Sequence, residues 1–171
     1  MSICTRVMEH PWYLAAQTVM AYAAMSEEPD LSPVLANILA SGRRLVLPRC
    51  ETRTVMTGRQ VFGPDDLSPG MFGILEPNCS LPKVNPSEID LVLVPGVGFD
   101  PRGRRLGRGN GYYDRFLHGF LGRTIGICFS DRLIQTIPTE DHDRSVDAVI
   151  TDTKSIYCTG GEVPGCVLES E

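Results

Sequence analysis

The chain has 171 residues, of which 42% are hydrophobic, and a formal net charge of -5 at pH 7. This length and apolar content are enough for one full hydrophobic core, so we expect a single domain. An acidic chain lacks the extended basic surface on which nucleic-acid binding rests, and no apolar run reaches the length of a membrane span. We therefore expect neither a nucleic-acid nor a membrane partner. We also expect a cytoplasmic protein that is a monomer.

Two segments in the first quarter of the chain have helical patterns. Residues 3–13 predict a helix that Pro11 disturbs. Residues 31–42 predict a second helix, with Ser32 as its N-cap and Gly42 at the position where helices commonly stop. Both segments carry apolar residues that a sheet could cover.

Five short apolar runs predict strands, and the last four are rich in β-branched residues, as strands buried on both faces are. They are residues 16–24, 44–48, 89–95, 123–129 and 146–151. Residues 52–61 alternate and predict a hairpin near the sheet edge, whereas residues 62–86 are rich in proline and glycine and predict a loop. Alternating strands and helices indicate an α/β fold, expected as a single three-layer domain with a mostly parallel sheet and helices on both faces.

In sheets of this kind, ligands bind outside the carboxyl ends of the strands. Three loops follow predicted strands at such an end: residues 25–30, residues 129–132, and the glycine- and arginine-rich residues 96–111. We expect these loops to converge on one crevice that takes two ligands.

The glycine- and arginine-rich loop is the most informative part of the chain. Glycines at positions 103, 107, 109 and 111 leave backbone N–H groups free to converge on an anion. Five arginines lie between Arg102 and Arg115, although the chain as a whole is acidic. A helix expected directly after the loop would point its first unsatisfied N–H groups at the same place. The loop therefore predicts a phosphate-binding site.

This loop matches neither of the two commonest phosphate motifs. A P-loop needs lysine and then serine or threonine after its last glycine, but Gly111 is followed by Tyr112 and Tyr113. A Rossmann fingerprint needs a third glycine at a spacing that GVGFDPRG lacks. Glycines alone mark turns about as often as they mark binding loops, and here the neighbouring arginines favour binding.

The segment GFDPRGRRLGRGNGYYDRFL, residues 98–117, resembles the signature of the 5-formyltetrahydrofolate cyclo-ligase family. The likeness runs from about residue 3 to about residue 151 and includes VMAYAAMSEEPD, FGILEP and SVDAVIT. It implies an enzyme that converts 5-formyltetrahydrofolate and ATP, with Mg2+, to 5,10-methenyltetrahydrofolate, ADP and phosphate. The alternative is a catalytically weakened relative that binds folate or nucleotide.

The resemblance also implies a set of site residues. The catalytic pair would be Arg108 and Tyr112. ATP would contact Arg105, Leu106, Gly107, Arg108, Gly109, Asn110, Gly111, Tyr112 and Tyr113. The folate would contact Met25, Asp30, Arg108, Gly109, Asn110, Gly111 and Tyr112. Magnesium would bind Asp114 and Asp147.

Each of these side chains also has a structural alternative. Asp114 in the first turn of a helix is favourable to the helix dipole without any metal. Asp147 could be a solvated residue at a strand edge, and Met25 could pack in the core. Tyr112 and Tyr113 are adjacent, so they cannot share a helix face, and one of them is expected to be a core aromatic.

The resemblance assigns residues 1–151 to the cyclo-ligase-like domain. That domain would lack the basic first helix with which family members normally begin. Residues 152–171 are expected to be a C-terminal extension, partly strand-like and partly flexible.

Overall fold

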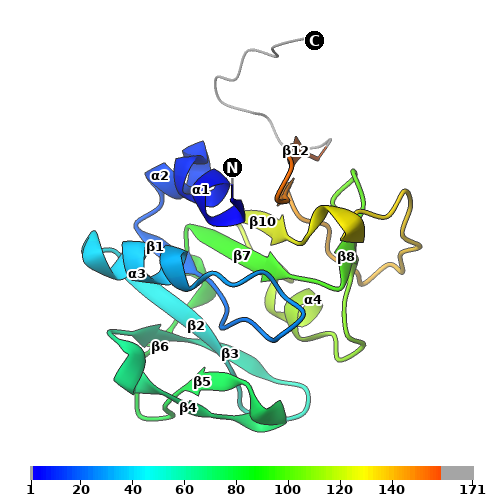
Figure 1. Ribbon diagram of the computed structural model, residues 1–171. Helices are drawn as coiled ribbons and strands as arrows, with labels where there is room; N and C mark the ends of the chain where they lie inside the picture. The colour runs from blue at the N-terminus through cyan, green and yellow to red at the C-terminus, as the bar shows by residue number, and fades with distance from the viewer. Residues whose placement is uncertain (1, 159–171) are drawn as a thin grey trace.

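An eight-stranded sheet forms the centre of the computed structural model, which describes residues 2–158 (Figure 1). The strands lie in the order β12-β11-β10-β7-β1-β2-β3-β6. They are β1 (Thr18–Met20), β2 (Arg44–Cys50), β3 (Met56–Val61), β6 (Lys83–Val84), β7 (Leu91–Pro95), β10 (Arg123–Ile127), β11 (Ala148–Ile150) and β12 (Ser155–Tyr157). Strands β11, β10, β7, β1 and β2 run parallel, and antiparallel strands complete both edges. The expected mostly parallel sheet is confirmed.

Strand β7 shows why the sheet is covered on both sides. Successive side chains of a strand point to opposite faces. Leu91 and Leu93 belong to one hydrophobic cluster, Val92 and Val94 to another, and all four are fully buried. A strand that is apolar at every position therefore needs a layer on each face.

Helices supply both layers. The helices α1 (Ile3–Glu9), α2 (Pro11–Ala15) and α3 (Ser32–Ala40) cover one face of the sheet, where Val7 and Ile38 join the cluster around Leu91 (Figure 1). The short helix α4 (Tyr112–Phe116) and Leu117 after it pack on the cluster of the other face. The three-layer arrangement with helices on both faces is confirmed.

The predicted helix over residues 3–13 is divided at His10. The His10 backbone is extended, and its ring nitrogen Nδ1 accepts a hydrogen bond from the Trp12 N–H at 3.2 Å. Pro11 then starts α2, because a missing N–H costs nothing at the first position of a helix. His10 thus ends one helix and begins the next.

The N-cap predicted for α3 was wrong. Leu31 occupies the N-cap position, and Ser32 is already helical. The carboxylate of Asp30 takes over the capping role, since its Oδ1 accepts hydrogen bonds from the Ser32 N–H at 2.9 Å and the Ser32 hydroxyl at 2.6 Å. The predicted end of this helix is confirmed, because Gly42 has the left-handed φ of 72°.

Residues 52–86 are more ordered than their composition predicts. Strand β3 forms a hairpin with β2 rather than within residues 52–61. The predicted loop over residues 62–86 contains a two-stranded ribbon, β4 (Leu67–Pro69) and β5 (Leu75–Pro77), and the edge strand β6. Single-turn helices η1 (Pro64–Asp66), η2 (Met71–Gly73) and η3 (Pro86–Glu88) connect them. In this segment, pairing with neighbouring strands outweighs the weak propensity of proline- and glycine-rich sequence to form strands.

Buried Asp100 organises the arginine-rich loop. The loop leaves β7 through β8 (Gly98–Phe99) and returns through β9 (Arg105–Leu106), which pairs antiparallel with β8. Oδ1 of Asp100 accepts hydrogen bonds from the backbone N–H groups of Arg102 and Arg104, and Oδ2 accepts one from Ile137. The carboxylate holds the tight turn between the two strands, so the residues after β9 start from a fixed position.

The C-terminal part of the described chain pairs as β12 with β11, in line with the expected strand-like extension. The rest of that extension, residues 159–171, lies outside the described residues. Across residues 2–158, no helix is both long and apolar enough to cross a membrane.

Candidate active site

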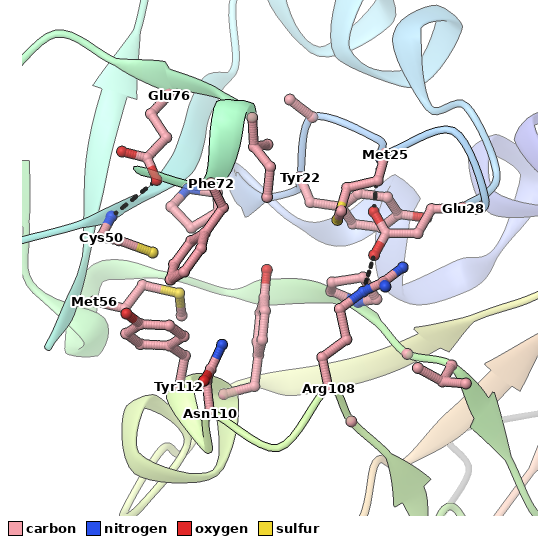
Figure 2. Close-up of a pocket in the computed structure, with 18 of the residues that line it drawn as sticks. Tyr22, Met25, Glu28, Cys50, Met56, Phe72, Glu76, Arg108, Asn110 and Tyr112 are labelled. Carbon is pink, nitrogen blue, oxygen red and sulfur yellow. Dashed lines mark hydrogen bonds and ion pairs between the residues drawn. The ribbon is translucent and has the colours of Figure 1, made fainter. Parts of the chain in front are cut away.

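A cavity of about 260 Å³ opens at the carboxyl ends of β1, β2 and β7 (Figure 2). Tyr22 and Met25 line it from the loop after β1, and Cys50 lines it from the end of β2. Phe72 and Tyr112 place aromatic rings in its wall from η2 and α4. The wall is therefore mostly apolar and aromatic, which suits a flat, partly hydrophobic ligand.

The arginine-rich loop forms one side of this cavity. Arg105 is almost buried, and its guanidinium forms an ion pair with Asp114 at 2.9 Å. The same guanidinium lies 5.5 Å from the ring centroid of Tyr113. Burial raises the pKa of the Tyr113 hydroxyl, so this side chain stays neutral beside the arginine. Arg105 is consequently held in place by its own loop and by α4.

Arg108 is the more exposed of the two cavity arginines. Its Nη2 lies 3.4 Å from the carboxylate of Glu27, and its Nε lies 3.8 Å from that of Glu28. Glu28 in turn accepts a hydrogen bond from the backbone N–H of Met25 at 3.0 Å. These contacts join the arginine-rich loop to the loop after β1. They are long and partly exposed, so they leave the Arg108 guanidinium free to exchange partners.

The start of α4 is fastened to the turn between β2 and β3. The Tyr112 hydroxyl donates a hydrogen bond to the Thr52 carbonyl at 2.8 Å. Arg115 donates to the carbonyls of Thr54 and Asn110 at 2.8 and 2.6 Å. These bonds fix the Tyr112 ring against the cavity.

A second cavity, of about 250 Å³, lies on the other side of the same loop. Apart from glycines, the residues that line it have polar or charged side chains: Gly109, Asn110, Gly111, Asp114, Arg115, His118 and His142. Asn110 and Gly111 line both cavities. Gly109 and Gly111 have φ values of 90° and 64°, a conformation in which a side chain would be strained. The two cavities are thus separated by a loop segment that is thin because it contains glycines.

The third loop predicted for the crevice also reaches it. Phe129 and Arg132 line a smaller cavity of about 20 Å³, together with Glu27 and Arg108. Arg132 belongs to the single-turn helix η4 (Ser130–Arg132), which follows β10. The predicted convergence of three loops distant in sequence is confirmed.

Most residues expected to contact ligands lie at these cavities, but two do not. Met25, Arg105, Arg108, Tyr112, Tyr113 and the loop residues 107–111 line one or both. The Leu106 side chain is 42% exposed and is not part of either lining, although its backbone pairs with Gly98. Asp30 is exposed and outside both linings, because its carboxylate caps α3. The structure therefore gives Asp30 a structural role.

The two predicted magnesium ligands stand in different surroundings. Asp114 lines the second cavity, and its Oδ1 also accepts a hydrogen bond from the Arg144 N–H. Asp147 directly precedes β11, and its Oδ2 accepts hydrogen bonds from the N–H and the hydroxyl of Thr124 at 2.8 and 2.9 Å. Neither of the two cavities is lined by both Asp114 and Asp147. The described residues contain no cluster of three or more His, Cys, Asp or Glu residues that could hold a metal. Their pairing stays a prediction.

Among the residues of the first cavity that sequence reasoning missed are Glu28, Cys50 and Glu76. Glu76 is only 4% exposed. Burial, followed by the nearby Glu76 charge, raises the pKa of the Cys50 thiol to about 11, so the thiol stays protonated. Glu28 stands two residues before Asp30, and Glu76 is the acidic residue of FGILEP. A carboxylate inside an otherwise apolar motif was the available signal, since burial of such a group is costly.

The fold and the site define an α/β protein with two cavities that share residues of one arginine- and glycine-rich loop. The family model described as the 5-formyltetrahydrofolate cyclo-ligase family matches residues 1–152, and the chain belongs to this family. A probable 5-formyltetrahydrofolate cyclo-ligase of Schizosaccharomyces pombe is 31% identical, over 91% of this chain and 84% of its own. The 5-formyltetrahydrofolate cyclo-ligase of Mycolicibacterium smegmatis is 34% identical, over 84% of this chain and 77% of its own.

A solved structure shows the same fold. The 5,10-methenyltetrahydrofolate synthetase of Aquifex aeolicus matches with a TM-score of 0.82 and 30% sequence identity, over 99% of this chain and 86% of the other.

Proposed function

We propose that this chain catalyses the ATP-dependent cyclisation of 5-formyltetrahydrofolate to 5,10-methenyltetrahydrofolate, with release of ADP and phosphate. Family membership supports the reaction. The observation that carries its assignment to this site is that Asn110 and Gly111 line two cavities at once. Two substrates bound on the two sides would meet across a wall of small residues. The reaction requires such a meeting, because a phosphoryl group must pass from one substrate to the other.

The first cavity suits the folate. Its aromatic rings, Phe72 and Tyr112, and the Met25 thioether offer flat and polarisable contacts for a pterin ring. The Tyr112 ring is already oriented by its hydrogen bond to Thr52, so little freedom would be lost when a ligand packs against it. Burial is also the main cause that raises the pKa of the Tyr112 hydroxyl, which favours a neutral positioning role. We assign this cavity to 5-formyltetrahydrofolate.

The second cavity suits the phosphates of ATP. Gly109 and Gly111 permit close approach to their backbone, and Arg115 and His118 add hydrogen-bond donors. Arg105 and Arg108 stand at the partition, where the transferred phosphoryl group would pass. Arginine is well suited to this position, because its planar fork matches the geometry of phosphate oxygens.

The chemistry explains why no protein nucleophile is needed. The formyl oxygen attacks the γ-phosphorus of ATP, the bond from that phosphorus to the ADP oxygen breaks, and ADP leaves. The second folate nitrogen, N10, then attacks the activated formyl carbon and loses its proton to water, and the bond from that carbon to the former formyl oxygen breaks as phosphate leaves with this oxygen. The protein has to align the two substrates and stabilise the negative charge on the transferring group. The Arg108 guanidinium, which holds only loose contacts with Glu27 and Glu28, is placed for that task.

We also propose that magnesium accompanies ATP. Asp114 lies beside the glycines, and magnesium typically takes one or two carboxylates and completes its shell with phosphate oxygens and water. Asp147 is proposed as the second carboxylate, with Oδ1 as the available oxygen, because Oδ2 is occupied by Thr124. Such an ion would neutralise charge on the nucleotide phosphates. We further propose that the protein acts as a monomer in the cytoplasm.

The direct test is a turnover assay on the purified chain. It is mixed with 5-formyltetrahydrofolate, ATP and magnesium, and the absorbance of the methenyl product is followed while ADP is measured in parallel. We expect one ADP for each methenyltetrahydrofolate. Binding of both substrates without product would instead establish the weakened relative, and failure to bind the folate would refute the proposal.

A further inference from the structure

The turn between β2 and β3, residues 51–55, lines neither the first nor the second cavity, yet α4 is anchored to it. Inside the turn, the Thr52 hydroxyl accepts hydrogen bonds from the backbone N–H groups of Thr54 and Val55 at 3.2 and 3.0 Å. A turn that is closed by its own side chain in this way holds its carbonyls in fixed directions. The proposed mechanism gives this turn no task.

Arg115 connects the turn to residues 110–111, the segment that lines both cavities. Its Nε donates a hydrogen bond to the Thr54 carbonyl at 2.8 Å, and its Nη2 donates one to the Asn110 carbonyl at 2.6 Å. Both acceptors are main-chain atoms, so the guanidinium fixes the backbone of two segments. Asn110 and Tyr112 line the first cavity together (Figure 2). A single side chain thus fastens the wall between the cavities to a turn outside them.

The packing around this guanidinium is specific for arginine. A Cβ at position 111 would lie 2.9 Å from Arg115 Nη1, closer than such atoms pack, so Gly111 leaves the space that the guanidinium fills. The guanidinium carbon also lies 5.6 Å from the ring centroid of Tyr112, within the range of a cation–π contact. A planar fork of N–H donors can meet both carbonyls and the ring at once, whereas a lysine ammonium is a compact point charge.

Arg115 has little to contribute to the stability of the fold. Its side chain is exposed, so its removal leaves no buried polar group without a partner. The bonds act instead on the orientation of the backbone that both substrates would approach. Phosphoryl transfer depends on such orientation, because a misplacement of about 1 Å can lower a rate roughly a hundredfold.

We propose that Arg115 is a positioning residue, which acts through Asn110 and holds the two substrates in line by fastening residues 110–111 to the β2–β3 turn. This inference rests on the proposed function and adds to it. It gives Arg115 a task that a positive charge alone cannot perform. It also gives a task to Thr52, whose hydroxyl closes the turn outside both cavities.

The test separates kcat from KM in the methenyltetrahydrofolate assay on the purified chain. Arg115→Lys keeps the charge but loses the fork, so kcat should fall roughly tenfold to a hundredfold, while KM for ATP and for the folate changes by less than about threefold. Thr52→Val keeps the size of the side chain but loses the acceptor, so kcat should also fall, by a smaller factor. A thermal melt of each variant should show no more than a small change.

Two control variants make the same chemical changes elsewhere. Arg102→Lys alters an exposed arginine of the same loop that lines neither cavity, and Thr5→Val removes a hydroxyl from α1. Both should keep the kcat of the unaltered chain.

The possible results distinguish the roles of Arg115. A higher KM for ATP with unchanged kcat in Arg115→Lys would overturn the inference, because Arg115 would then only bind charge. An unchanged kcat in Thr52→Val would overturn it too, and so would a fall in kcat that merely follows a loss of folded protein. If the unaltered chain binds both substrates but makes no product, the proposed function fails, and the inference fails with it.

Discussion

Replacement of Arg108 by alanine should separate catalysis from stability. The Arg108 side chain is 41% exposed, and its partner Glu27 is 70% exposed, at 3.4 Å. An exposed ion pair of this kind is worth about 0–1 kcal/mol, so the melting temperature should fall by no more than about 2–4 °C. The same guanidinium would stabilise charge on the transferring phosphoryl group. Loss of one such donor typically costs about 3–4 kcal/mol of barrier, or roughly a hundredfold to a thousandfold in rate.

The assay is the initial rate of methenyltetrahydrofolate formation with both substrates saturating, together with kcat/KM for each substrate and a thermal melt. Arg102→Ala is the control, since it removes one positive charge from an exposed position of the same loop that lines neither main cavity. It should keep most of the activity. Equal turnover of Arg108→Ala and the unaltered chain would remove Arg108 from the catalytic residues. Equal losses in both variants would mean that only the net charge of the loop matters.

Three further predictions concern the metal, an acid-sensitive histidine and a strained residue. Asp114→Asn and Asp147→Asn should each weaken magnesium-dependent ATP binding in calorimetry, and magnesium alone should bind poorly; an unchanged Asp147→Asn would refute the pairing. Burial lowers the pKa of His10 to about 4, so the unfolded chain takes up a proton first as the pH falls below about 6.5. The free energy of unfolding should therefore decline between pH 6.5 and 4, by an amount on the order of 3 kcal/mol. His10→Asn keeps an acceptor at the N-cap, so denaturant melts of this variant should no longer show this pH dependence. If the free energy of unfolding of His10→Asn still declines over this pH range, other titratable groups cause the decline. Phe72 has the left-handed φ of 68° and is 59% exposed, so Phe72→Gly should relieve about 1 kcal/mol of backbone strain while it raises KM for the folate. A lower melting temperature with an unchanged KM would contradict that prediction.

Local patterns were sufficient for the framework of the fold. The apolar runs that became β2, β7, β10 and β11 were visible because a strand buried on both faces is apolar at every position. The end of α3 was visible at Gly42, because few other residues adopt its backbone conformation without cost. The arginine- and glycine-rich loop was visible for a similar reason, because Gly103, Gly109 and Gly111 have positive φ values that favour glycine.

The position of each carboxylate was decided only by tertiary structure. Asp30 and Glu28 lie in the same short acidic loop, and nothing in their spacing shows that one caps α3 while the other faces Arg108. Glu76 enters the cavity because β5 pairs with β4 and so carries this side chain toward Cys50, within a segment that its composition predicts to be a loop. The cavity itself is formed by residues from five separate parts of the chain. Backbone conformation is governed by neighbours in sequence, whereas the environment of a charged side chain depends on which distant segments pack against it.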